Sequence, residues 1–396
     1  MPSARRSRRP RPRPAPPRPE PRPRAGVLRG RAEEFAAALP EVLGFRPVES
    51  LVVLCFGGGG RRPKELVFTV RLDLVDVEHD EDLVAAVRDQ VRRIQPLPRR
   101  AMFFVVTEDA DDQVEAVAAD PWRVVPHRPD ADVRPLLPDL PRRALVHTFV
   151  EAFDGLGIGT HDALLVRGGR WWSYPDVDPL TGAAAGQPLD VEGSRLTGVA
   201  ALNGQVVETD RAAAAARAWP TAPPTIAVLG ACQRAEDALV TRLGDGDLDG
   251  VVADYRTVVD DALRAHEPGS RVALTPDALA AVAAGLLLVP VRDHALAMTA
   301  APVHDDRGEA AAAAAEILWT ELVTRLPDDL AGVPALLMGT AAWLRGSGVL
   351  AVSALERSLV CEPTPMAEML LDAVRANTPP AVLRAVLTAP GDGGAG

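Results

Sequence analysis

Six polar residues have the types and positions that a site for an anionic or polar ligand requires. They are Arg46, Ser50, Arg71, Asp73, Arg292 and Asp293. Guanidinium groups donate hydrogen bonds in a fork that fits carboxylate and phosphate, while hydroxyl and carboxylate groups orient a polar substrate. The set lies at predicted strand ends and helix starts, where backbone groups add to the binding of anions. If these residues converge, they form a ligand site in the first half of the chain.

The first four lie in the stretch with the clearest local structure, residues 41–74. Residues 31–43 have the apolar spacing of an amphipathic helix, and Gly44 follows where a helix ends in a left-handed residue. Arg46-Pro47 then turns the chain, because the residue before proline is pushed out of the helical region. Residues 51–56 are a continuous apolar run, which predicts a strand that is buried on both faces.

The next strand, residues 66–74, alternates between apolar and polar side chains. The apolar set on one face is Leu66, Phe68, Val70, Leu72 and Leu74. Arg71 and Asp73 both lie on the opposite face, about 6–7 Å apart along the strand. This pattern has two interpretations, a solvated ion pair on an open face or a binding face that uses both charges.

Two glycine-rich segments do not fit the motifs that bind phosphate. In residues 57–64 the lysine is followed by Glu65 and a strand, whereas a P-loop lysine is followed by Ser or Thr and a helix. Residues 155–159 follow a helix instead of preceding one, so they predict a helix end. We find no nucleophile-elbow or zinc-protease motif. We therefore expect no cofactor and no metal, and we assign no catalytic residue.

Residues 162–174 predict a β-hairpin around Gly168-Gly169, because a two-residue turn requires positive φ at both positions. Trp171, Trp172 and Tyr174 follow the turn. They form either a stacking platform for a base or sugar, or cross-strand packing within the protein.

The charge of the chain is strongly asymmetric. Among 396 residues the formal net charge is −11, but residues 1–31 hold eleven Arg and one Glu, a charge of +10. The remaining residues must therefore carry −21. A body this acidic is a poor generic binder of nucleic acid.

Cysteine usage and hydropathy indicate the cytoplasm. Cys55, Cys232 and Cys361 are far apart and lack CxxC spacing, which argues for a reducing compartment and against a disulfide framework or zinc site. We see no apolar run of the roughly 18 residues that a spanning helix needs. No apolar segment follows the basic N-terminus, so we expect neither a secretory signal nor a membrane span.

The chain divides into two structural halves with flexible ends. We predict a disordered Arg/Pro-rich arm at 1–26, an α/β domain at 27–215, a linker at 216–224, a helical domain at 225–385 and a flexible Gly-rich tail at 386–396. The α/β domain has a mixed sheet with hairpins and flanking helices. The arm either makes a weak electrostatic contact with an anionic partner or is an unselected extension.

The second half is predicted to be almost wholly helical, with short connections that favour antiparallel neighbours. The expected helices are 225–243, 248–266, 276–288, 291–298, 308–324, 332–344, 348–361 and 365–377. Residues 333–363 are similar to one tetratricopeptide unit, with Gly339, Gly346, Ala351 and Pro363 at that spacing. Ser358 replaces the usual alanine, and a single unit is not an array. We expect an all-α domain of tetratricopeptide-like helical hairpins.

Four segments carry a resemblance to a known family. LPEVLGFRPVESLVVL followed by VRLDL, then LLVRGGRWWSY, VRDHAL and AAWLRGSGVLAVSALERSL, resemble the family catalogued as domain of unknown function 4192. The resemblance implies a cytoplasmic protein of high-GC bacteria and brings no activity. Members often carry a cysteine-containing segment after the Trp-Trp-Ser-Tyr run. Here that segment reads PDVDPLTGAAAGQP, so no redox or metal role is carried over.

Two hypotheses follow. The first is a non-catalytic binding or scaffold protein whose helical half contacts a protein partner. The second is an enzyme or small-ligand binder of the α/β half, with the six polar residues around its substrate. The second hypothesis requires those residues to share one concave site, and the first does not.

Overall fold

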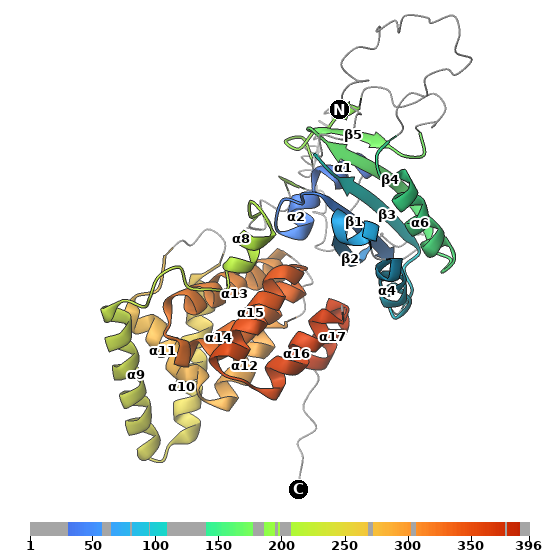
Figure 1. Ribbon diagram of the computed structural model, residues 1–396. Coiled ribbons are helices and arrows are strands. Elements are labelled where there is room, and N and C mark those ends of the chain that lie inside the picture. The colour runs from blue at the N-terminus through green and yellow to red at the C-terminus, as the bar shows by residue number, and fades with distance from the viewer. Residues whose placement is uncertain are drawn as a thin grey trace, which may run out of the picture.

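The computed structural model has two parts, a sheet-containing half and a helical half (Figure 1). It describes residues 31–57, 65–79, 81–94, 96–108, 140–176, 186–194, 197–198, 207–267, 272–301, 306–376 and 378–388. The predicted arm at 1–26 and most of the loop at 57–64 lie outside the described residues. So do residues 389–396 of the predicted tail.

A mixed sheet of six strands forms the first half, as the sequence predicts. The strands are β1 (Ser50–Gly57), β2 (Glu65–Asp73), β3 (Arg100–Val106), β4 (Gly159–Arg167), β5 (Arg170–Ser173) and β6 (Gln187–Pro188). Their order across the sheet is β2-β1-β3-β4-β5-β6. Among the described strands, β3 and β4 pair in parallel and the other neighbours in the sheet are antiparallel.

Helices cover both faces of the sheet (Figure 1). They are α1 (Ala32–Ala37), α2 (Leu39–Leu43), α3 (Leu74–His79), α4 (Glu81–Arg92) and α6 (Arg143–Asp154). Leu51, Val53 and Cys55 of β1 share a core with α4 and α6, while Val52 and Leu54 share another with α1 and α2. The continuous apolar sequence of β1 is explained by the burial of this strand on both faces of the sheet.

A β-bulge modifies the alternation predicted for β2. The register with β1 shifts between Cys55, which pairs with Phe68, and Phe56, which pairs with Leu66. The extra residue moves Leu66 to the face that α1 and α2 cover, away from Val70 and its neighbours. The predicted single apolar face is therefore wrong at its first residue.

The β4–β5 hairpin confirms the predicted turn and shows the role of two of the three aromatic residues. Gly168 and Gly169 have φ of 55° and 68°, as a two-residue hairpin turn requires. Trp172 and Tyr174 are buried in the core, and the Tyr174 hydroxyl donates to the carbonyl oxygen of Pro141 at 2.5 Å. These two rings are core packing, so they do not form a stacking platform.

The second half contains only helices among its described residues. Following the short α8 (Arg211–Ala216), these are α9 (Ile226–Gly244), α10 (Leu248–Ala265), α11 (Pro276–Leu286), α12 (Val289–Thr299), α13 (Asp306–Arg325), α14 (Asp328–Leu344), α15 (Gly348–Cys361), α16 (Pro365–Arg375) and α17 (Pro380–Thr388). The eight predicted helices are present, and α17 is an addition. In the part of the chain that the structure describes, no single helix reaches the length and hydropathy of a membrane span. Only α11 and α12 together do so, with a bend of 105° between them.

The centre of the helical half is α14, which is buried along nearly its whole length. Its partner α15 approaches closely at Gly339. A Cβ built there would lie 2.6 Å from Cγ of Leu355 and 3.1 Å from the carbonyl oxygen of Ala351. The absence of a side chain at Gly339 therefore sets the distance between the two helices.

We predict that Gly339→Ala lowers the free energy of unfolding by about 1–3 kcal/mol, because overpacking forces α14 and α15 apart. The matched control is Gly230→Ala in α9, where the nearest atom to an added Cβ is the end of the Arg234 side chain at 3.5 Å. That change should stabilise by up to about 1 kcal/mol through helix propensity. Chemical denaturation measures both, and equal effects would contradict the packing argument.

Candidate functional site

Three of the six predicted site residues meet at one end of the sheet. Ser50 begins β1 and lies opposite Asp73, the last residue of β2, while Arg71 lies two residues earlier. Nε of Arg71 donates to Oγ of Ser50 at 2.8 Å, and its Nη2 lies 2.6 Å from Oδ1 of Asp73. The guanidinium and the Ser50 hydroxyl also donate to the carbonyl oxygen of Val48, at 3.2 and 2.6 Å. These bonds join the start of β1 to the end of β2.

The Arg71 side chain is occupied by groups of its own chain. It is only 13% exposed, and its contacts are a hydroxyl, a carbonyl and a carboxylate. Asp73 is 42% exposed and lies 3.8 Å from Nη1 of Arg211 in α8. An anionic ligand at Arg71 would have to displace Asp73. The geometry therefore favours an ion pair with a structural role over a binding face.

At the neighbouring strand ends, polar groups are likewise bonded to other groups of the chain. Glu49 has a left-handed φ of 40°, and its carboxylate accepts from Oγ1 of Thr107 at 2.7 Å and from the backbone N–H of Glu108 at 2.6 Å. The Glu108 carboxylate in turn accepts from the N–H of Gly168 at 2.8 Å. The carboxyl ends of parallel strands are the usual place for ligands in α/β proteins. At the ends of β3 and β4, carboxylates of the chain occupy these positions.

The other three predicted residues lie elsewhere. The Arg46 side chain is exposed, and its backbone N–H donates to the carbonyl oxygen of Glu208 at 3.1 Å. Arg292 and Asp293 pair with each other at 3.0 Å on α12, in the helical half (Figure 1). Within the described ranges, no hydrogen bond or ion pair joins α12 to the Arg71 group. The structure therefore brings together Ser50, Arg71 and Asp73 and leaves the remaining three apart.

The cysteines do not supply a reactive group. All three are free, with Cys55 and Cys232 buried and Cys361 half-buried. Burial raises the pKa of each thiol above its ordinary value, which disfavours the reactive thiolate. Among the residues that the structure describes, no three His, Cys, Asp or Glu side chains gather as metal ligands.

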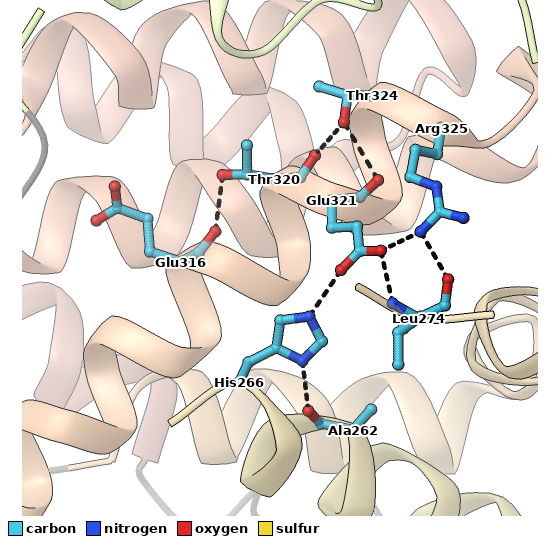
Figure 2. A network of polar contacts seen from close by, with 8 residues as sticks. All are labelled: Ala262, His266, Leu274, Glu316, Thr320, Glu321, Thr324 and Arg325. Carbon is cyan, nitrogen blue, oxygen red and sulfur yellow. Dashed lines mark hydrogen bonds and ion pairs between the residues drawn. The ribbon is translucent and has the colours of Figure 1, made fainter. Parts of the chain in front are cut away.

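A buried polar network, which sequence reasoning missed, joins α10 to α13 (Figure 2). His266 follows α10 and is 4% exposed. Its Nε2 lies 2.7 Å from Oε2 of Glu321, and its Nδ1 lies 2.8 Å from the carbonyl oxygen of Ala262. A carbonyl and an ionised carboxylate only accept hydrogen bonds, so both ring nitrogens must donate. The geometry therefore assigns a charged imidazolium to His266.

The pKa shifts of the pair agree with this assignment. The hydrogen bond to Glu321 raises the pKa of His266, against the opposing effect of burial. Burial raises the pKa of Glu321, but the hydrogen bonds from His266 and Leu274 and the charge of Arg325 outweigh it, so that pKa is lowered. His266 and Glu321 thus each favour the charged form of the other, although both side chains are largely shielded from solvent.

The network also fixes the segment that leads into α11. The second oxygen of Glu321 accepts from the N–H of Leu274 at 2.9 Å and pairs with Arg325, which donates to the carbonyl of Leu274 at 2.8 Å. Leu274 precedes Thr275, the N-cap of α11. No local pattern reveals this network, because His266 and Glu321 are 55 residues apart.

A third polar group lies where the two halves meet. Glu208 forms a parallel β-bridge with Phe45, beside α2. Arg217 lies 3.6 Å from the Glu208 carboxylate and 3.2 Å from that of Glu316 on α13. Arg345, after α14, reaches the other oxygen of Glu316 at 2.8 Å. Residues 207–225, which we call the connector, are therefore held by both halves.

The same connector packs on α15 through Trp219. Its Nε1 donates to Oγ of Ser353 at 3.0 Å, and that hydroxyl donates to the carbonyl oxygen of Ala215 at 2.7 Å. The guanidinium of Arg357 lies 5.1 Å from the centre of the Trp219 ring. These contacts give the connector a defined place against the helical half.

The four sequence segments that suggested a family lie in elements of both halves, and comparison with known proteins agrees. The profile of the family described as "Domain of unknown function (DUF4192)" matches residues 33–381 of the 396-residue chain. The chain belongs to this family. The match spans the sheet, the connector and all but the end of the helical half. Searches of the curated proteins and of the solved structures find no match.

We predict that Arg71→Met lowers the free energy of unfolding by about 2–3 kcal/mol, because it removes charge-assisted hydrogen bonds from a half-buried group. Arg46→Met, at an exposed side chain, should change it by less than about 0.5 kcal/mol. Chemical denaturation measures both. An Arg71→Met protein as stable as the wild type would contradict the structural role. Arg71 would then again be a candidate for ligand binding.

The His266–Glu321 pair predicts a pH-dependent stability. Because the folded pKa of His266 is raised, its contribution is complete below about pH 6.5 and is lost as pH rises through the folded pKa. Because the pKa of Glu321 is lowered, its contribution is present above about pH 4.5 and is lost as pH falls through the folded value. The pair therefore stabilises the fold most in the window between these two values.

We expect His266→Gln to destabilise by about 1–3 kcal/mol near pH 5.5 and by clearly less near pH 9, as measured by urea denaturation at each pH. The control is His294→Gln. His294 lies 2.7 Å from Asp260, which is 36% exposed, so this change should cost less than about 1 kcal/mol. A pH-independent effect of His266→Gln would show that the imidazole is not charged in the native protein.

Proposed function

We propose that the protein is a non-catalytic cytoplasmic binding protein that docks a protein partner through its helical half. The supporting observation is a row of exposed apolar side chains on one face of α9. Ile226 is 89% exposed and Val240 is 70% exposed, and Leu229 and Leu243 are exposed beside them. Exposed apolar side chains gathered on one face are typical of docking surfaces, and a helix face is a common way to present them.

The row is separate from the face of α9 that packs in the protein. Val228, Ala231, Cys232 and Leu239 are the buried residues of this helix, and they pack in the core of the helical half. In Figure 1, α9 stands at the outer edge of that half, away from the sheet. Since one apolar face is already used by the core, the second is available to another molecule.

The stacking of the helices supports the same function. α14 and α15 form a hairpin with the glycine spacing of one tetratricopeptide unit, and Gly339 allows their close approach. The Ser358 hydroxyl, at a position usually held by alanine, donates to the carbonyl oxygen of Gly332 at 2.8 Å. As part of this proposal, the helical half is a tetratricopeptide-like stack, an architecture that forms extended surfaces for binding other molecules.

The alternative is an enzyme or small-ligand binder in the α/β half. One observation favours it: Thr107 and Arg167 are buried polar residues at the carboxyl ends of the parallel strands β3 and β4. Against it, Arg71 and the carboxylates of Glu49 and Glu108 already bond to groups of the chain. The geometry therefore gives more support to protein docking.

Site-specific photo-crosslinking in living cells tests the proposal. A photoreactive amino acid replaces Val240 on the exposed row, and in the control protein it replaces Ala238. Ala238 is also exposed but faces away from the row on the same helix. We expect illumination to give a discrete protein adduct from position 240 and none from position 238.

The mass of the adduct reports whether the partner is another protein or a second copy of the chain. Absence of any adduct at 240, or the same adducts at both positions, would refute docking by this face. Either outcome would leave the α/β half as the place to look for function.

A further inference from the structure

The exposed face of α9 has the spacing of a coiled-coil seam. We define the α9 stripe as Ile226, Leu229, Gln233, Glu236, Val240 and Leu243. These positions alternate in steps of three and four, the spacing of the a and d positions of a heptad. The four apolar members are exposed, and Gln233 is exposed and Glu236 half-buried. The stripe thus has apolar residues at both ends and a polar pair at its centre.

The stripe is symmetric about its own midpoint, between Arg234 and Ala235. Rotation by a half-turn about that midpoint exchanges Ile226 with Leu243, and it exchanges Leu229 with Val240. The same rotation exchanges the two central polar residues. A surface with this symmetry is complementary to a copy of itself in the antiparallel orientation, which is the property of an isologous two-fold interface.

We infer that the α9 stripe pairs with the α9 stripe of a second copy of this chain, antiparallel, to form a homodimer. This inference rests on the proposed function, because it names the occupant of the same docking surface. In the dimer the two outer layers at each end are apolar. Leu229 of one copy packs against Val240 of the other, and these contacts exclude water from side chains that are exposed in the single chain.

The central layer selects the antiparallel orientation. In that orientation Gln233 of one copy lies opposite Glu236 of the other, so an amide N–H can donate to a carboxylate, twice by symmetry. A parallel pair would place Glu236 against Glu236 and repel. In the single chain Gln233 donates to Asp237 at 3.2 Å. Since the amide carries two N–H groups, this bond is compatible with the new one.

The size of the stripe sets the strength of the dimer. α9 has 19 residues, which makes it about 28 Å long. A pair of such helices buries an area at the lower end of specific interfaces. We therefore expect a reversible dimer with a dissociation constant on the order of micromolar.

The register is tested first, by disulfide trapping in the full-length protein. Leu229→Cys and Val240→Cys proteins are prepared separately and then mixed under mild oxidation. We expect a covalent dimer from the mixture only, because position 229 faces position 240 of the other copy. Two copies of position 229 are about 16 Å apart along the helices, too far for a disulfide. A covalent dimer from each variant alone would overturn the antiparallel pairing. The absence of a covalent dimer from the mixture would also overturn it.

The second test is sedimentation velocity across a concentration series. Leu229→Asp should raise the dissociation constant about 100-fold, because the substitution occurs twice in a symmetric dimer. The matched control Ala238→Asp, on the opposite side of α9, should leave it unchanged. A wild-type monomer at about 100 micromolar, or equal effects of the two variants, would overturn the inference.

A charge exchange distinguishes pairing from a loss of folding. Gln233→Glu places like charges in the central layer and should weaken the dimer about tenfold or more. Adding Glu236→Gln restores one carboxylate per layer and should return the dissociation constant to near the wild-type value. Failure of this rescue would refute the assigned layer.

The inference and the proposed function fail in different ways. A monomer in solution whose position 240 crosslinks to a different protein in cells would overturn the homodimer and leave protein docking in place. A monomer that gives no crosslink at 240 would refute both. A dimer that depends on Leu229 supports both.

Discussion

The arrangement of the two halves depends most on the ion pairs that the carboxylate of Glu316 makes. It lies between Arg217 of the connector and Arg345 at the end of α14. Arg217 also reaches Glu208, whose backbone pairs with the chain beside α2. These side chains are each less than a third exposed, so their charges are less screened than those of a surface pair. The network links the sheet to the centre of the helical half.

The polar residues at the sheet end are part of the same construction. Asp73 ends β2 with one oxygen on Arg71 and the other near Arg211 of α8. The edge of the sheet therefore contacts the connector through charged groups. In a binding site, the same groups would be exposed to a ligand. In this fold the Arg, Asp and Ser residues at these strand ends hold the start of β1 to the end of β2, and Asp73 also lies near Arg211 of the connector. Such residues take part in folding even where their types also suit a ligand.

The helical half combines a well-packed interior with an apolar outer face that the core does not use. The buried imidazolium of His266 and the carboxylate of Glu321 order the entry to α11, against which α9 packs. The core takes the side of α9 that contains Ala231 and Leu239, and the heptad-spaced side stays in solvent. The proposed docking surface lies on a well-supported helix, so it loses little conformational entropy on binding, which favours specific association.

Local sequence determined the elements, and tertiary structure decided what they do. The apolar run of β1, the glycine turn of the β4–β5 hairpin and the apolar periodicity of the helices depend on near neighbours, so they were predictable. The proximity of Ser50, Arg71 and Asp73 was also predictable, since two successive strands joined by a short glycine-rich loop usually pair with each other. The bulge at Leu66, the separation of Arg292 from Arg71 and the contact of His266 with Glu321 were not. Each depends on which distant segment packs alongside, and periodicity along one element carries no information about that choice. The same reason applies to α9, where the sequence shows two apolar faces and only the packing shows which one the core uses.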